Sequence, residues 1–203
     1  MNLDLSTASA CIILAIILVV SARAYRHADR RYEDGKSERI ASPCHFSWVY
    51  RWIQASTLIG GFSAYLTSWP ILLEVHESRA LLWAGQLVML LGLWLFVFSK
   101  RTLGAEYSPC FDSWVSQRIV RSGPYAKIRH PIYTANLMIL GGLFLATGSV
   151  WLGLNALVLF AYYLVAARRE ESALGKRYPE YAAYRREAGQ FLPRAFHSLV
   201  SSD

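Results

Sequence analysis

The amino-acid sequence predicts an all-α integral membrane protein with about five transmembrane helices, on three observations. Only 17% of its 203 residues are charged and 54% are hydrophobic, whereas a soluble domain carries about 25% charged residues. Uncharged apolar segments recur along the chain, and about 20 helical residues cross the ~30 Å hydrocarbon core of a bilayer. Basic residues gather in alternate connections between these segments. We therefore expect one membrane domain over residues 1–203.

Apolar segments place the expected spans near residues 5–23, 50–72, 80–99, 131–147 and 150–170. The uncharged stretch from Tyr133 to Ala166 has 34 residues, which as one helix would be roughly 50 Å long. Gly148 and its neighbours divide this stretch, because glycine and serine interrupt helices. The sequence therefore predicts a helical hairpin. The first span is preceded by no Lys or Arg and followed by several, which favours a retained anchor over a cleaved signal.

The basic residues also predict an orientation. Seven Lys and Arg fall in residues 23–51, one in 70–79, six in 100–130, none in 147–149 and seven from 168 onward. Because cytoplasmic loops are enriched in positive charge, this alternation places the N-terminus outside and the C-terminus in the cytosol. The net charge of +7 is thus explained by topology. Basic stripes with interleaved aromatics, typical of single-strand binders, are absent, so we expect no nucleic-acid partner.

The cysteines predict neither a disulfide framework nor a metal site. Cys44 and Cys110 lie in loops assigned to the cytosol, where disulfides are rare, and Cys11 lies in a span. No Cys and His spacing suits zinc. We therefore expect no metal.

A polar cluster stands directly before the fourth span, where residues 123–133 read Gly-Pro-Tyr-Ala-Lys-Ile-Arg-His-Pro-Ile-Tyr. Proline suits the first turn of a helix, so Pro131 should begin the span and His130 should end a loop. Unpaired N–H groups at a helix start attract anions, and Arg129 offers a planar set of donors for a carboxylate or phosphate. Each residue alone is common at a membrane boundary, but the whole cluster favours a binding site.

A second charged cluster follows the fifth span, at Glu170 and Glu171. Acidic residues near a bilayer are functional candidates, either for ribose hydroxyls, as in dinucleotide sites, or for a cationic ligand. Alternatively, neighbouring arginines neutralise them on a wet surface. Beyond them, Tyr181 and Tyr184 share a helical face, which predicts an interfacial helix with aromatic anchors.

Together these features resemble the isoprenylcysteine carboxyl methyltransferase and phospholipid methyltransferase superfamily of integral membrane enzymes. The resemblance rests on the Gly-Pro-Tyr-x-x-x-Arg-His-Pro-x-Tyr block, the hairpin, the Glu-Glu pair and the Tyr series at 178, 181 and 184. It covers about residues 118–194, whereas residues 1–100 match only as helical spans. It implies that S-adenosylmethionine binds on the cytosolic face and that a lipid-like or isoprenoid acceptor enters from the bilayer.

Carried onto this chain, the resemblance assigns cofactor binding to Ile119, Val120, Gly123, Tyr125, Arg129, His130, Pro131, Tyr133, Glu170 and Glu171. Arg129, His130 and Glu171 are the catalytic candidates, and we expect Arg129 and His130 to position charged groups rather than abstract a proton. The implied reaction is direct methyl transfer to a carboxylate or an amine, in which the protein orients the reactants and excludes water.

The chain departs from the family pattern in three places. Ala166 stands where the family usually has an Arg, although Arg168 lies three residues before Glu171 and would share its helical face. Lys176-Arg177 replaces Phe-Gly, and Ala188-Gly189 replaces Val-Pro.

Other functions also remain open. A soluble Rossmann-type methyltransferase is excluded because no Gly-x-Gly-x-x-Gly follows a strand. An NADPH-dependent enzyme similar to sterol reductases shares much of the C-terminal block, and Lys176-Arg177-Tyr178 partly matches its pattern. A non-catalytic membrane partner protein is supported by the missing Arg at position 166.

Overall fold

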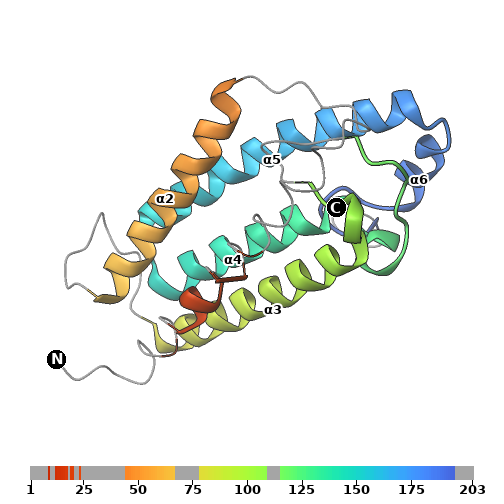
Figure 1. Ribbon diagram of the computed structural model, residues 1–203. Coiled ribbons are helices and arrows are strands. Elements are labelled where there is room, and N and C mark those ends of the chain that lie inside the picture. Colours follow the sequence, from red (N-terminus) through yellow and green to blue (C-terminus); the bar gives the residue numbers. More distant parts are fainter. Residues whose placement is uncertain are drawn as a thin grey trace, which may run out of the picture.

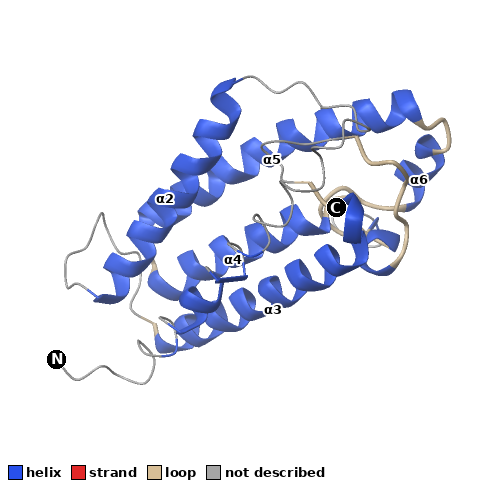
Figure 2. Cartoon of the chain, viewed as in Figure 1, coloured by secondary structure: helices blue, strands red, loops and turns tan. Residues whose placement is uncertain are grey.

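The computed structural model describes residues 44–66, 78–108 and 115–194, together with residues 9, 12–17, 19–20 and 23. Within these residues the regular structure is helical, and Figure 2 shows no strand. The long helices are α2 (Cys44–Leu66), α3 (Arg79–Leu103), α4 (Pro131–Thr147) and α5 (Val150–Arg177). A short helix α6 (Tyr181–Glu187) and the 3-10 turns η2 (Gly104–Glu106) and η3 (Gly123–Ala126) complete the described part. The all-α class is confirmed for these residues.

The helices form one bundle (Figure 1), in which α3 and α4 lie side by side, α5 packs on α4 and α2 packs on α5. Small residues bring α3 and α4 into direct backbone contact. A Cβ atom on Gly142 would lie 2.7 Å from the carbonyl oxygen of Gly85, and one on Gly92 would lie 2.9 Å from that of Ala135. Such close approach is typical of helices packed in membranes, where small residues line the interface. The start of α4 is thereby held against α3.

The hairpin predicted between the last two spans is confirmed. Gly148 adopts a left-handed conformation with φ of 67°, and its N–H donates to the carbonyl of Phe144 over 2.8 Å. This is a common helix C-terminal cap, for which glycine carries no Cβ penalty. As a result α4 ends at Thr147 and α5 begins at Val150, the bounds expected from the sequence.

Three helices extend beyond the expected spans. Helix α2 begins at Cys44 rather than near residue 50, α3 continues to Leu103 and α5 continues to Arg177. Charged residues had set the expected limits, but Arg and Lys are good helix formers. The charges mark where the apolar part of a helix ends, whereas the helix itself continues into polar surroundings. Gly175 lies inside α5.

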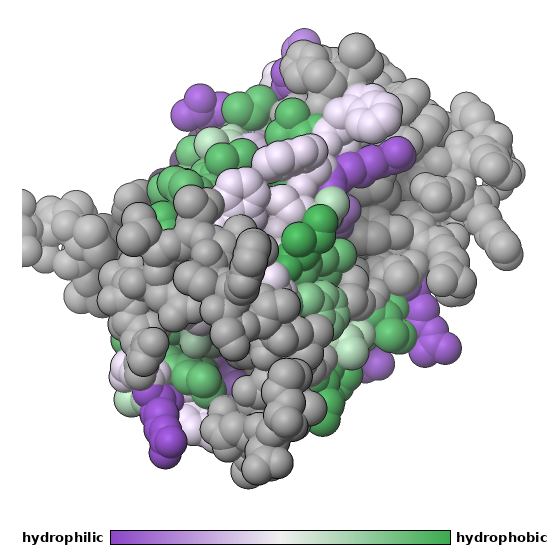
Figure 3. All heavy atoms as spheres, turned by 90° about the vertical axis from the view of Figure 1, so that its left-hand side faces the viewer, coloured by the Kyte–Doolittle hydropathy of each residue, from purple (hydrophilic) through white to green (hydrophobic). Residues whose placement is uncertain are grey.

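The surface of the bundle is unusually apolar. Trp48, Trp94 and Leu157 are each more than 60% exposed, and Figure 3 shows hydrophobic side chains exposed on one end of the molecule. Large exposed apolar patches mark membrane or protein contacts. Among the described residues, two helices are long and apolar enough to cross a membrane, Arg79–Glu106 and Val150–Arg177, and Pro131–Thr147 is a shorter apolar helix. The count of five spans stays a prediction, and the described residues cover only about half of the expected first span.

Candidate functional site

The site forms where the loop before α4 meets the segment after α6. The backbone N–H of Arg129 donates to Gly189 O over 2.8 Å, that of His130 donates to Gln190 O over 3.0 Å, and that of Gly189 donates to Lys127 O over 3.0 Å. Ala188 and Gly189 stand where the family usually has Val-Pro. A proline in place of Gly189 would have no N–H to donate to Lys127. A Cβ atom on Gly189 would also overlap the carbonyl oxygen of Leu192. The glycine at position 189, which departs from the family pattern, is therefore suited to the backbone hydrogen bonds between residues 127–130 and 189–190.

Glu171 is the buried centre of an ion-pair network. Its Oε1 accepts hydrogen bonds from Arg129 Nε at 3.0 Å and Gln190 Nε2 at 3.2 Å, and it lies 3.1 Å from His130 Nε2. Its Oε2 lies 3.3 Å from Arg185 Nε. The side chain is only 6% exposed. Since hydrogen bonds to charged groups are the stronger ones, Glu171 holds the loop before α4 in place.

His130 lies between the two glutamates. Its Nδ1 is 3.5 Å from Glu170 Oε2, and Tyr133 donates its hydroxyl hydrogen to Glu170 Oε1. Burial lowers the pKa of His130, but the hydrogen bonds and charges of Glu170 and Glu171 outweigh it and raise the pKa above its usual 6.5. As an imidazolium, His130 has two N–H donors, and each faces a carboxylate. The raised pKa and this geometry therefore favour the protonated ring.

The imidazole also belongs to an aromatic stack. The rings of His130 and Tyr133 are stacked with centroids 5.2 Å apart, and those of Tyr133 and Tyr163 with centroids 4.3 Å apart. Asn136 Nδ2 donates to the hydroxyl of Tyr163 over 2.7 Å. Offset-stacked aromatic pairs contribute about 0.5–1.5 kcal/mol beyond their burial. The stack fixes the direction in which Tyr133 presents its hydroxyl to Glu170.

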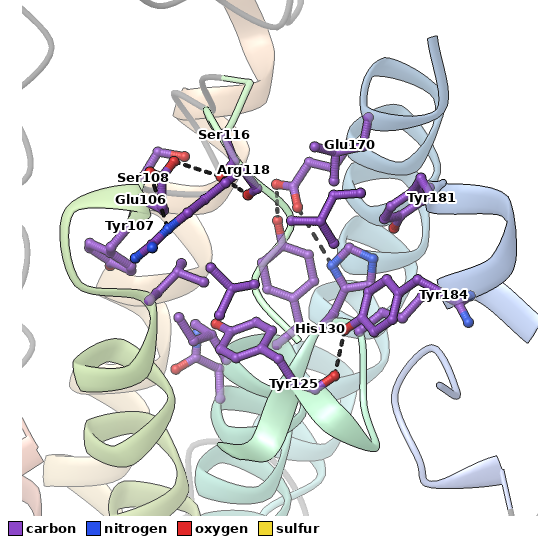
Figure 4. A pocket seen from close by; sticks show the side chains of 18 of the residues that line it. Glu106, Tyr107, Ser108, Ser116, Arg118, Tyr125, His130, Glu170, Tyr181 and Tyr184 are labelled. Carbon is purple, nitrogen blue, oxygen red and sulfur yellow. Dashed lines mark hydrogen bonds and ion pairs between the residues drawn. The ribbon is translucent and has the colours of Figure 1, made fainter. Parts of the chain in front are cut away.

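These groups border a cavity between the ends of α3, α4 and α5 (Figure 4). Its volume is about 130 Å³, and the empty space including its open mouth is about 940 Å³. A dry cavity of about 150 Å³ accommodates a benzene ring, so a larger ligand would extend into the mouth. Of the residues expected from the sequence, the cavity is lined by Ile119, Val120, Tyr125, Arg129, His130, Tyr133 and Glu170.

Three of the expected residues support the cavity from outside its lining. Glu171 lies behind Arg129 and His130. Pro131 is fully buried and opens α4, as predicted. Gly123 opens η3 with φ of 56°, and a Cβ atom there would lie 3.0 Å from Thr102 Oγ1. These residues shape the site through the backbone or through their neighbours.

Tyr181 and Tyr184 correct the expectation of an interfacial helix. They are 2% and 4% exposed and line the cavity, where Figure 4 places both on the α6 side. The hydroxyl of Tyr184 donates to the carbonyl of Tyr125 over 2.6 Å. Burial raises the pKa of Tyr184 to about 12, against the opposing effect of Arg129, and burial also raises the pKa of Tyr125 and Tyr181. All three phenols stay neutral at physiological pH.

Sequence reasoning missed a polar group on the opposite side of the cavity. Glu106 accepts hydrogen bonds from the hydroxyl of Ser116 and the N–H of Gln117, both over 2.7 Å, and Arg118 Nε lies 3.9 Å away. Figure 4 shows this group facing Glu170 and His130 across the cavity. The sequence did contain a signal for Glu106. It is an acidic residue just after the apolar helix α3, in the same way that Glu170 comes just after the apolar part of α5.

Among the described contacts, Arg168 does not pair with Glu171. Arg168 and Arg169 line a separate groove on the other side of α5, whereas the ion-pair partners of Glu171 are Arg129 and Arg185. Ala166, at the position where the family has an Arg, is 3% exposed and packed in the core.

The part of the chain that the structure describes contains no group of three or more His, Cys, Asp or Glu side chains placed to hold a metal ion. Cys11 and Cys110 lie outside it.

The described residues thus form a helical bundle with apolar side chains on its surface and, at the ends of its helices, a cavity lined by acidic and aromatic residues, as expected of a membrane-associated protein. The chain belongs to the phospholipid methyltransferase family, whose model matches residues 80–181. The matched region includes Glu106, the 123–133 block, both glutamates and Tyr181.

Two curated relatives are similar to this chain over part of their length. The cobalt-zinc-cadmium resistance protein CzcN of Cupriavidus metallidurans is 33% identical over 116 residues, which are 55% of this chain and 52% of that protein. The nickel-cobalt-cadmium resistance protein NccN of Alcaligenes xylosoxydans xylosoxydans is 35% identical over 80 residues, 39% of this chain and 38% of that protein. The match thus spans about half or less of each relative.

Proposed function

We propose that this protein binds S-adenosylmethionine in the cavity and transfers its methyl group to a lipophilic acceptor, a carboxylate or an amine. The observation that carries the proposal is the position of the His130, Glu170 and Tyr133 group, which borders a cavity inside the region matched by the methyltransferase family. When bound, the cofactor would supply an activated methyl group on a positively charged sulfur.

The lining of the cavity suits both ends of this cofactor. The Glu170 carboxylate and the ring of Tyr125 favour a cationic group, since aromatic faces attract cations. Arg129, which also lines the cavity, favours a carboxylate. The described residues would therefore bind and orient the cofactor through opposite charges placed near one another.

The geometry supports a positioning role for His130 rather than proton abstraction. Both ring nitrogens face carboxylates, at 3.1 and 3.5 Å, so an imidazolium has no free lone pair with which to accept a proton. A carboxylate acceptor needs no base, and an amine acceptor would need to arrive neutral. The chain would accelerate transfer by orienting the two reactants and excluding water.

For the membrane topology we propose five spans, with the N-terminus outside and the cavity at the cytosolic face. The alternation of basic loops supports this orientation, and the exposed apolar side chains of α3 and α5 support their contact with lipid. Labelling of single cysteines introduced at exposed loop positions, with and without membrane permeabilisation, would test the orientation.

The names of the two relatives favour a physiological setting in metal resistance. We propose that the methylated product, rather than a metal site in the chain, provides this role. Growth of a deletion strain in cobalt, zinc and cadmium, complemented with wild type or Glu170→Gln, would test it. Full rescue by a variant that no longer binds the cofactor would reject the link.

Binding of the purified chain to S-adenosylmethionine and to NADPH in detergent would separate the three candidate functions. We expect S-adenosylmethionine alone to bind. Binding of NADPH alone would support the reductase-like alternative, and binding of neither would support a non-catalytic partner protein. His130→Ala and Glu170→Ala should abolish cofactor binding while circular dichroism shows the helical content unchanged.

A further inference from the structure

A second, basic groove lies on the side of α5 that faces away from the cavity. Its volume is about 660 Å³, within the range of small-molecule sites. Val115, Val165, Arg168, Arg169, Ser172, Ala173, Lys176 and Arg177 line it. The described lining therefore brings together four cations and a hydroxyl and contains no carboxylate.

The two sides of α5 differ in charge within a single turn. Glu170 and Leu174 line the cavity, whereas Arg168, Arg169 and Ser172 line the groove. Glu171 is 6% exposed and is engaged by Arg129, His130, Gln190 and Arg185. Glu171 is therefore engaged away from the groove, and the groove cations Arg168, Lys176 and Arg177 would attract an anion. Because arginine presents a planar set of donors that matches phosphate oxygens, a phosphate group is the favoured anion.

An exposed apolar stripe continues from this groove along the same helix. Leu154, Val158 and Val165 are 51%, 49% and 41% exposed. Their spacing of four and then seven residues keeps them on one face, and three further residues lead to Arg168. Helix α5 is also long and apolar enough to cross a membrane. An acyl chain would lie along this stripe with its headgroup at the cations.

We propose that the groove and stripe bind an anionic phospholipid, with its phosphate among Arg168, Ser172 and Lys176 and an acyl chain along Leu154, Val158 and Val165. The inference does not depend on methyl transfer, since none of these residues lines the cavity. It also gives Arg168 a role. Arg168 is close to Glu171 in sequence, but Glu171 pairs with Arg129 and Arg185.

Native mass spectrometry of the full chain in detergent, incubated with equal amounts of phosphatidylglycerol and phosphatidylcholine, would test this proposal. We expect a several-fold preference for phosphatidylglycerol in the wild type. The double variant R168Q/K176Q should lose that preference, because two basic residues that each contribute about fivefold near an anionic surface are enough to account for a several-fold effect. The charge-retaining variant R168K/K176R should keep most of it.

R101Q/R186Q is the matched control, because Arg101 and Arg186 are exposed cations outside the groove. It removes the same charge and should keep the preference. Equal loss in both double variants would reject the groove in favour of a nonspecific charge effect. If the wild type showed no preference for phosphatidylglycerol, that result alone would overturn the proposal. Thermal stabilisation by inorganic phosphate alone, with no lipid preference, would likewise reject a lipid ligand.

Discussion

Tyr184 donates its hydroxyl hydrogen to the backbone carbonyl of Tyr125 across 59 residues of sequence, over 2.6 Å. This bond joins α6 to η3, and both tyrosines line the cavity. Helix α6 is only seven residues long, and isolated helices of that length are not stable in water. Its contribution to the site therefore depends on such tertiary bonds.

Tyr184→Phe should lower the free energy of unfolding by about 1–3 kcal/mol, because the buried carbonyl of Tyr125 would lose its partner. It should also weaken binding of S-adenosylmethionine by displacing the Tyr125 side of the cavity. Thermal unfolding and a binding isotherm in detergent would measure both. Tyr178→Phe is a useful comparison, because the hydroxyl of Tyr178 donates to Ser116 on the other side of the cavity. Unchanged stability and affinity in Tyr184→Phe would contradict the role given to this bond.

Substitution of Glu170 and of Glu171 should affect stability and cofactor binding to different degrees. Glu171→Gln leaves Arg129 and His130 buried without their shared carboxylate, and breaking a buried ion pair costs about 3–5 kcal/mol. The side chain of Glu170 is 23% exposed, so Glu170→Gln should destabilise the fold less and weaken cofactor binding more. Denaturation and binding of the two variants, measured side by side, would check this order. The reverse order would place the cofactor contact at Glu171.

The pH dependence of stability should follow His130. Its pKa is raised in the folded protein, while that of the unfolded chain is about 6.5. The stabilisation by the imidazolium is therefore fully present below about pH 6.5 and is lost as the pH rises through the folded pKa. Melting temperatures across this range should fall for the wild type and fall less for His130→Gln. NMR titration of the His130 ring would give the pKa directly, and a value below 6.5 would disprove the expected direction.

Gly189 and Gly175 should respond oppositely to alanine. At Gly189 a Cβ atom would overlap the carbonyl oxygen of Leu192, whereas at Gly175 it would meet nothing within 4 Å. Gly175 lies inside α5, where alanine is favoured over glycine by about 1 kcal/mol. Gly189→Ala should therefore destabilise the protein and weaken cofactor binding, and Gly175→Ala should raise the melting temperature. Tolerance of alanine at Gly189 would show that residues 188–194 pack differently.

Much of the fold was predictable because its signals are local. Pro131 marked the start of α4, and Gly148 marked the turn before α5, each through its own backbone preference. The chemistry of residues 129–133 was also visible in the sequence, because several uncommon residues occur within one helical turn of a long apolar stretch.

The remaining parts of the site depend on contacts between distant segments. Tyr181 has the spacing of a surface anchor, and only its packing against Ile119 and Leu174 shows that it is buried. Arg168 has the sequence spacing to reach Glu171, but Arg129 and Arg185 occupy that carboxylate in the folded chain. Glu106 gains its place only when Ser116 and Gln117 fold back toward the end of α3.

The backbone contact between Gly85 and Gly142 has a consequence at the other end of these helices. Glu106 follows α3 and His130 precedes α4, so the two helices carry the opposite sides of the cavity. Because neither glycine has a side chain, main-chain atoms of the two helices meet there and limit how closely the helices approach. The distance that a ligand must bridge is thus determined within the apolar bundle, by residues that the ligand never touches.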